Sequence, residues 1–191
     1  MSNETIKSYF LSLSKNLWDM AIVILIAAAI VFPIRKFIFQ PFIVSGSSME
    51  PTYYTGDYLI IDELSYRFNE PAREDVIVFS YPQNPEQKFI KRIIGLPGET
   101  VEIKGGKVFI EQGDKRFELQ ELYLPSNILT IDERRMTLNQ GEYFVMGDNR
   151  MASYDSRKWG SLPKDKIIGK VLIKVFSPKK IFGANLSGLI K

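Results

Sequence analysis

The chain has 191 residues, of which 45% are apolar, and it contains no histidine and no cysteine. This size allows one substantial core with an anchor, or at most two small domains. The missing residue types exclude Ser-His-Asp and Cys-His catalysis, and every metal site built on histidine or cysteine. The net charge of +3 argues against a general nucleic-acid binder.

The N-terminal part of the chain contains a membrane candidate. Residues 1–19 are polar and serine-rich, and an uncharged apolar run of fifteen residues follows over Met20–Ile34. A helix needs roughly 20 apolar residues to cross a bilayer, but Arg35 and Lys36 after the run can extend to the headgroups. We therefore expect a transmembrane anchor over residues 20–40. A cleaved signal peptide and a buried core helix are the alternatives.

Basic residues accumulate toward the C-terminus. From Arg157 onward there are nine basic residues, against Asp165 as the single acidic one. A solvated basic face explains this excess, and contact with anionic lipid headgroups is the alternative.

After residue 41 the chain changes to short apolar stretches separated by glycine, proline and asparagine, which is typical of an all-β domain. β-branched and aromatic residues predict strands over Tyr58–Asp62, Asp75–Tyr81, Lys88–Ile94, Thr100–Lys104, Lys107–Glu111, Arg116–Leu119, Glu142–Met146 and Ile167–Phe176. The pairs Gly105-Gly106 and Gly113-Asp114 predict hairpin turns. We therefore expect a mainly β fold, an antiparallel barrel-like or sandwich domain.

Ser48 is the candidate nucleophile. It lies in the segment Ser45–Thr52, where glycine and proline impose a tight, irregular backbone directly after Pro41–Val44, a further possible strand. Such a turn presents a hydroxyl group and backbone amides together. A hydrolase needs the hydroxyl to attack a carbonyl and the amides to receive the oxyanion that develops. An ordinary surface turn is the alternative.

Lys91 is the candidate base, since histidine is absent. Strand alternation places it on the same face as the apolar residues Phe89 and Ile93. Burial among apolar groups disfavours the ammonium and lowers a lysine pKa, so a neutral amine can accept a serine proton near neutral pH. The alternative is a lysine that extends into solvent from a half-buried strand.

The polar segment Gly147–Gly160 predicts a long ordered loop. Two acids and two arginines lie in it: Asp148, Arg150, Asp155 and Arg157. We expect bidentate ion pairs among these four residues that hold the loop against the strands. Ser153 and Ser156 are then available as hydrogen-bond partners for a nearby amine.

Four blocks of this sequence resemble, in family order, the motifs of the type I signal peptidases. They are S-G-x-S-M-x-P-T at Ser45–Thr52, a Gly-Asp block with apolar residues at Gly56–Ile61, K-R-x-x-G-x-P-G at Lys91–Gly98, and a final block at Gly147–Gly160. Each block alone is a weak signal. All four in order, after one N-terminal apolar run, argue strongly against a chance match.

The resemblance implies a serine endopeptidase that removes signal peptides from exported preproteins, without a metal or another cofactor. Ser48 would attack the scissile carbonyl, and Lys91 would accept its proton and later protonate the leaving amine, with an acyl-enzyme between the two steps. Ser153 matches the hydroxyl that orients the lysine, and the Ser48 amide matches an oxyanion donor. Many relatives carry a second serine where this chain has Gly46, so Ser47 or a backbone amide would replace it.

The family's substrate pocket accepts small residues at the first and third positions before the cut. The matching positions of this chain are Phe42, Val44, Met49, Tyr53, Phe89 and Ile90. Bulky walls of this kind leave room only for small side chains, and ordinary core packing is the alternative for each residue.

The resemblance also implies a topology. Residues 1–19 would lie in the cytosol and residues 20–40 would span the plasma (inner) membrane once, in contact with the lipid bilayer. Residues 41–191 would form the catalytic domain on the exoplasmic or periplasmic side. Larger relatives carry an additional β subdomain at the position of residues 99–141, and we expect a reduced one here.

Three rival functions remain open. A self-cleaving repressor-type protease shares the Ser/Lys pair, but a DNA-binding domain would stand where this chain has its apolar run. An inactive membrane-anchored binding protein would not need both Ser48 and Lys91. A peptidase dedicated to one exported substrate differs only in its specificity.

Overall fold

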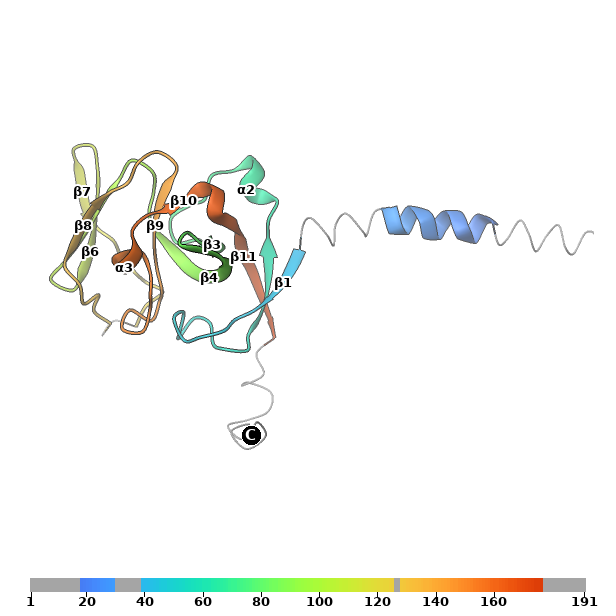
Figure 1. Cartoon of the computed structure of the whole chain (residues 1–191), viewed down its shortest axis with the longest axis horizontal. Helices are drawn as coiled ribbons and strands as arrows, with labels where there is room; N and C mark the ends of the chain where they lie inside the picture. Colours follow the sequence, from blue (N-terminus) through green and yellow to red (C-terminus); the bar gives the residue numbers. More distant parts are fainter. Residues whose placement is uncertain (1–17, 30–38, 126–127, 177–191) are drawn as a thin grey trace, which may run out of the picture. The chain divides into compact units, whose positions relative to one another are not determined.

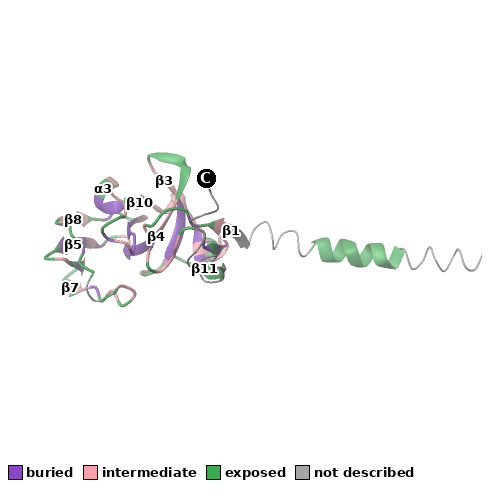
Figure 2. Cartoon of the chain, turned by 90° about the horizontal axis from the view of Figure 1, so that it is seen from below, coloured by how far each residue is buried: buried purple, intermediate pink, exposed green. Residues whose placement is uncertain are grey.

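The computed structural model describes residues 18–29, 39–125 and 128–176 (Figure 1). The chain divides into two compact units, Met1–Phe39 and Gln40–Lys191. Residues 18–29 are helical and exposed throughout (Figure 2). Within the described residues, no helix is both long and apolar enough to span a bilayer. The predicted anchor over residues 20–40 includes residues 30–38, which lie outside the described ranges.

The second unit is mainly β, with two antiparallel sheets, which confirms the predicted fold class at this level. The larger sheet has the strand order β1-β2-β11-β3-β4-β9-β10. Its strands are β1 (Phe39–Ile43), β2 (Tyr58–Asp62), β3 (Val76–Tyr81), β4 (Asn84–Gly95), β9 (Glu142–Met146), β10 (Leu162–Pro163) and β11 (Ile167–Phe176). Short helical turns lie at α2 (Ser65–Phe68), α3 (Ser156–Trp159) and η1 (Lys164–Lys166).

The smaller sheet has the order β7-β6-β5-β8. Its strands are β5 (Thr100–Lys104), β6 (Lys107–Gln112), β7 (Lys115–Glu118) and β8 (Arg134–Thr137). Gly105 and Gly106 join β5 to β6. Both have the positive φ angles that a two-residue hairpin turn of type I′ requires. Gly113, also at positive φ, lies in the turn between β6 and β7. In Figure 1, β6, β7 and β8 lie together at the end of the unit opposite β1.

Strand β3 explains why the larger sheet is buried on both faces. Val76 and Val78 belong to the core cluster on one face, and Ile77 and Phe79 belong to the cluster on the other. This is the alternation that a strand covered on both sides requires. A third cluster joins the two sheets, because Phe144 of β9 packs with side chains of β5 and β6.

The strands differ most from the sequence prediction at β4, β8 and β10, whereas β1, β3, β6 and β7 differ by one or two residues at their ends. β8 and β10 were not predicted, and β4 begins at Asn84 instead of Lys88. The first five residues of β4 are exposed, so they carry no apolar signal. β8 has two arginines and alternates only half-buried and exposed side chains, so pairing with β5 makes it a strand.

Candidate active site

Ser48 lies in the loop between β1 and β2, and hydrogen bonds tie the two sides of that loop together. The amide of Val44 donates to the carbonyl of Asp57 at 3.0 Å. Nearer to Ser48, the Thr55 hydroxyl accepts from the Gly46 amide at 3.1 Å and donates to the Gly46 carbonyl at 3.0 Å. Hydrogen bonds within the loop between β1 and β2 therefore hold it in a compact conformation.

Asn149 holds the backbone of the nucleophile loop from the Gly147–Gly160 segment. Its amide donates to the Ser48 carbonyl at 3.0 Å, and its side chain donates to the Ser47 carbonyl at 3.1 Å. The two polar segments are therefore in direct contact. The sequence prediction did not single out Asn149, because an asparagine in a polar loop carries no signal for a distant partner.

Lys91 extends from β4 toward Ser48 and is almost entirely buried, with 4% of its surface exposed. Its Nζ donates hydrogen bonds to Ser48 Oγ at 2.8 Å and to the Ile90 carbonyl at 2.9 Å. Burial lowers the pKa of Lys91 to about 8, although the negative charges of Asp155 and Asp148 act in the opposite direction. An amine with this pKa exists partly as the neutral base near neutral pH.

Gly147 occupies the narrow space between Ser48 and Ser153. A Cβ atom at position 147 would lie 2.3 Å from the Ser48 carbonyl oxygen and 2.3 Å from Ser153 Oγ. The Ser153 hydroxyl oxygen is buried near Asp155, and it makes no well-aligned hydrogen bond with the described residues. Ser153 therefore lies beside the backbone of Ser48, whereas the Lys91 amine donates to Ser48 Oγ and to the Ile90 carbonyl.

Asp155 and Arg157 pair with each other at the start of α3. Arg157 donates from Nε at 2.8 Å and from Nη2 at 2.9 Å to the two oxygens of Asp155. Burial alone would raise the pKa of Asp155, but the bonds and the charge of Arg157 outweigh it and hold that pKa below its usual range. Asp155 also accepts from the Gly147 amide at 3.0 Å, so this pair fixes the beginning of the loop.

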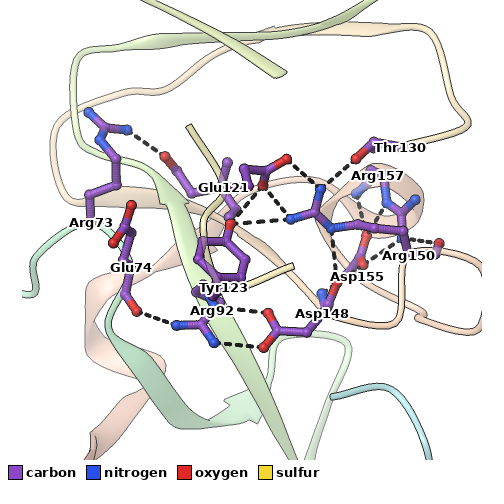
Figure 3. Close-up of polar contacts among 12 residues, drawn as sticks. Arg73, Glu74, Arg92, Glu121, Tyr123, Thr130, Asp148, Arg150, Asp155 and Arg157 are labelled. Carbon is purple, nitrogen blue, oxygen red and sulfur yellow. Dashed lines mark hydrogen bonds and ion pairs between the residues drawn. The ribbon is translucent and has the colours of Figure 1, made fainter. Parts of the chain in front are cut away.

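Asp148 and Arg150 take partners from outside the loop, which corrects the expectation of pairing among the four residues. Asp148 accepts from Arg92 at 2.9 Å and 2.6 Å (Figure 3). Arg150 binds both carboxylate oxygens of Glu121, one of them at 2.8 Å. The physical reason is burial, because Arg92 and Arg150 are both buried and a buried guanidinium needs a carboxylate partner.

A groove of about 440 Å³ runs beside Ser48 and Lys91. Among the predicted pocket residues, those that line it are Phe42, Val44, Phe89 and Ile90. Met49 and Tyr53 do not, because the nucleophile loop turns them inward against the core cluster beneath it. Lining residues that the prediction missed include Leu59, Val78, Ala152 and Tyr154. Leu59, Ala152 and Tyr154 lie inside two of the four sequence blocks, and Val78 lies in β3, but nothing in the sequence marked their side chains as facing a groove.

The groove follows an open edge of β4. β3 pairs with β4 along its length, from Val76 opposite Arg92 to Tyr81 opposite Asn84. β9 pairs only with the last part of β4, from Arg92 to Gly95. Among the described strands, the second edge of residues 84–91 therefore has no partner, and its last four residues line the groove. Such an edge offers backbone donors and acceptors to an extended peptide.

Comparison with known proteins gives consistent matches. Residues 17–176 match the family described as signal peptidase, peptidase S26. A signal peptidase I of Leptolyngbya laminosa is 38% identical over 158 residues, which cover 78% of this chain and 74% of the relative. Signal peptidase I P of Bacillus subtilis subsp. natto is 38% identical over 175 residues, which cover 85% and 90%. A signal peptidase I crystal structure from Enterococcus faecalis V583 covers 55% of this chain and 98% of its own, at 34% identity and a TM-score of 0.46.

Proposed function

Because the chain belongs to the signal peptidase family, peptidase S26, we propose that it removes N-terminal signal peptides from preproteins, with Ser48 as nucleophile and Lys91 as base. Its family makes it a serine-type peptidase and therefore a hydrolase. One observation carries the proposal for the two residues: Lys91 Nζ lies 2.8 Å from Ser48 Oγ in a buried site beside a groove.

Lys91 has the properties that a base for serine requires. When protonated, its Nζ donates to Ser48 Oγ, and after losing that proton its lone pair can accept the proton of the hydroxyl. A pKa of about 8 leaves roughly one amine in ten neutral at pH 7. Burial therefore supplies a base without histidine.

The reaction then follows in two halves. Attack of Ser48 Oγ on the scissile carbonyl carbon transfers the hydroxyl proton to Lys91 and forms a tetrahedral oxyanion. When the C–N bond breaks, Lys91 protonates the leaving amine, and the signal peptide remains as an ester on Ser48. Neutral Lys91 next takes a proton from a water molecule that attacks the ester carbonyl, and it returns this proton to Ser48 Oγ when the ester C–O bond breaks.

The developing oxyanion needs preorganised donors. We assign one to the backbone amide of Ser48. The Gly46 amide already donates to Thr55 at 3.1 Å, so it is engaged elsewhere. Ser47 lines the groove next to the nucleophile and is our candidate for the second donor.

Ser153 is proposed to orient the amine of Lys91. A lysine ammonium has three donors, and the contacts to Ser48 and Ile90 use two of them. The buried Ser153 hydroxyl makes no well-aligned hydrogen bond with the described residues, lies near Asp155, and is across Gly147 from the Ser48 backbone. We assign the third donor of the Lys91 amine to the Ser153 hydroxyl.

The substrate is proposed to bind as an extended peptide along the open edge of β4. Main-chain hydrogen bonds to this edge give affinity that does not depend on sequence. Selectivity comes from the apolar wall, to which Leu59, Val78 and Ile90 contribute. Such branched side chains fill the groove and favour small residues near the cut.

We further propose that residues 20–40 anchor the chain in the plasma membrane, with residues 41–191 on the exoplasmic side. The helical residues 18–29 expose large apolar side chains, among them Trp18 at 68% and Leu25 at 70%. Apolar side chains on all sides of a helix suit a lipid environment. Protease added to spheroplasts should digest the β unit, and its protection there would contradict this topology.

The proposed function is tested with the detergent-solubilised full chain and an exported precursor that carries a signal peptide. Wild-type protein should release the signal peptide, and Ser48→Ala and Lys91→Ala should not. Lys104→Ala, at an exposed position at the end of β5, is the control and should cleave normally. Cleavage that persists in either active-site variant would contradict the proposed pair.

A further inference from the structure

Arg150 is a buried arginine, with no exposed side-chain surface, whose partners come from two parts of the chain. Its Nε donates to the carbonyl of Gly147 at 3.1 Å, so it holds the residue that packs against Ser48. Its terminal nitrogens bind Glu121, and Nη1 also binds the Thr130 hydroxyl at 2.5 Å (Figure 3). Glu121 and Thr130 lie between β7 and β8, outside all four sequence blocks.

Tyr123, from the same stretch, contacts both of the arginines that hold the loop. Its hydroxyl accepts from Arg150 at 3.3 Å and donates to Glu121 at 2.7 Å. Its ring lies against the guanidinium of Arg92, 3.9 Å from the ring centre. Arg92 is the residue directly after Lys91 in β4.

The two arginines act on adjacent loop residues. Arg92 binds Asp148, which also accepts from the Thr52 hydroxyl in the nucleophile loop at 2.5 Å. Arg150 binds Gly147, against which the Ser48 carbonyl packs. A displacement of either arginine therefore moves the nucleophile loop relative to β4.

We infer that Glu121 and Tyr123 are positioning residues for cleavage, through which the stretch between β7 and β8 keeps Ser48 aligned with Lys91. The inference rests on the proposed function and extends it to residues outside the motifs. Neither residue lines the groove. They therefore affect the rate of the chemical step and leave the affinity for the peptide unchanged.

The negative charge of Glu121 neutralises the buried guanidinium of Arg150. In Glu121→Gln the side chain keeps its shape, but Arg150 becomes a buried cation without its countercharge. Asp148, whose charge already acts on Arg150, then becomes an alternative partner. Arg150 and Arg92 would compete for Asp148, and the loop that contacts Ser48 would shift.

The test compares kcat and KM of the purified full chain in detergent, with a peptide substrate that spans a signal-peptide cleavage site. For Glu121→Gln we expect kcat to fall by roughly 10- to 100-fold at unchanged KM, as expected for misalignment of reacting groups. Glu118→Gln is the matched control, because Glu118 forms a surface pair with Lys107 at 2.9 Å. It should keep the wild-type kcat and KM.

Tyr123→Phe gives an independent measurement, since it removes only the hydroxyl and keeps the ring against Arg92. We expect its kcat to fall by about two- to tenfold, the range for one lost hydrogen bond. If Glu121→Gln does not fold, as judged by thermal melting, the Tyr123→Phe result decides. A folded variant with wild-type kcat, or with a raised KM alone, would overturn the inference. Cleavage by Ser48→Ala would instead overturn the proposed function on which it rests.

Discussion

Lys91 and Arg92 are neighbours in β4, and their side chains bind two different segments of the proposed catalytic centre. Lys91 Nζ lies 2.8 Å from Ser48 Oγ, whereas Arg92 binds the two oxygens of Asp148 at 2.9 Å and 2.6 Å. One strand thus sets the position of the amine and of the loop that contacts the nucleophile. Substitutions at Lys91 should therefore affect proton transfer, and substitutions around Arg92 should affect alignment.

The base is tested most directly by Lys91→Arg. This variant keeps a long cationic side chain, but a guanidinium stays protonated and cannot accept the serine proton. We expect kcat/KM for a peptide substrate to fall by about 100- to 10,000-fold, the usual contribution of a general base. Lys104→Arg, at the exposed end of β5, is the control. A Lys91→Arg enzyme that keeps most of the wild-type rate would rule out this role.

The pH dependence of cleavage should follow the proton of Lys91. The amine acts as a base only when neutral, and its pKa in the folded chain is about 8. We expect kcat/KM to rise about tenfold per pH unit below this value and to level off above it. Rates measured across the range from about pH 6 to pH 10 test this, and a profile that is flat or falls toward pH 8 would contradict it.

Lys91→Met should stabilise the fold at neutral pH, because a buried ammonium costs free energy. The pKa is about 8 in the folded chain against 10.5 for an ordinary lysine, so the unfolded chain holds this proton more tightly. Wild-type stability therefore rises with pH between these two values. The variant should gain up to about 3 kcal/mol at pH 7, and the gain should shrink above pH 8.

Chemical unfolding of the two proteins at neutral and at alkaline pH measures this gain. Lys104→Met, which removes an exposed lysine, should show no comparable change. A Lys91→Met variant that is less stable than wild type at neutral pH would show that the lysine is held by stronger contacts than its burial implies.

The strands that could be predicted are those that bury side chains in a regular pattern. β2 and β5 each alternate buried with more exposed residues, and their predicted bounds agree with the structure. β8 and residues 84–87 of β4 were missed because polar residues and a proline form them, and each depends on pairing with a neighbouring strand. The conformation of such segments comes from tertiary context, which no local pattern contains.

The polar network around the site could be predicted only in part. Asp155 and Arg157 are two residues apart, so their pairing lies within one local segment. Glu121 lies 29 residues from Arg150, in a stretch without a motif, and only the fold brings them together. The sequence did indicate that Arg92 has an acidic partner, because Arg92 lies in an apolar strand and a buried arginine requires one. The identity of that acid still depended on the three-dimensional structure.

Gly147→Ala should reduce activity for steric reasons. The added Cβ would lie 2.3 Å from both the Ser48 carbonyl oxygen and Ser153 Oγ, so one of these segments must move. We expect kcat to fall by about tenfold or more and stability to fall by roughly 1–3 kcal/mol. Gly113→Ala is the control, because Gly113 has a φ of 58° with open space around it. Backbone strain in Gly113→Ala should lower stability by about 1 kcal/mol without changing kcat. Equal losses of kcat in Gly147→Ala and Gly113→Ala would refute the steric explanation.

Tyr154 should contribute to the affinity for the substrate. It lines the groove, and its hydroxyl lies 3.1 Å from that of Tyr81, whose ring in turn stacks on Phe89 at 4.9 Å. This support gives the exposed ring a fixed position against a bound peptide. Tyr154→Ala should raise KM by about two- to tenfold, as for the loss of one aromatic contact, and Tyr154→Phe should stay near wild type. Met151→Ala is the control, since Met151 is exposed and lies outside the groove lining. An unchanged KM in Tyr154→Ala would mean that the bound peptide does not contact this ring.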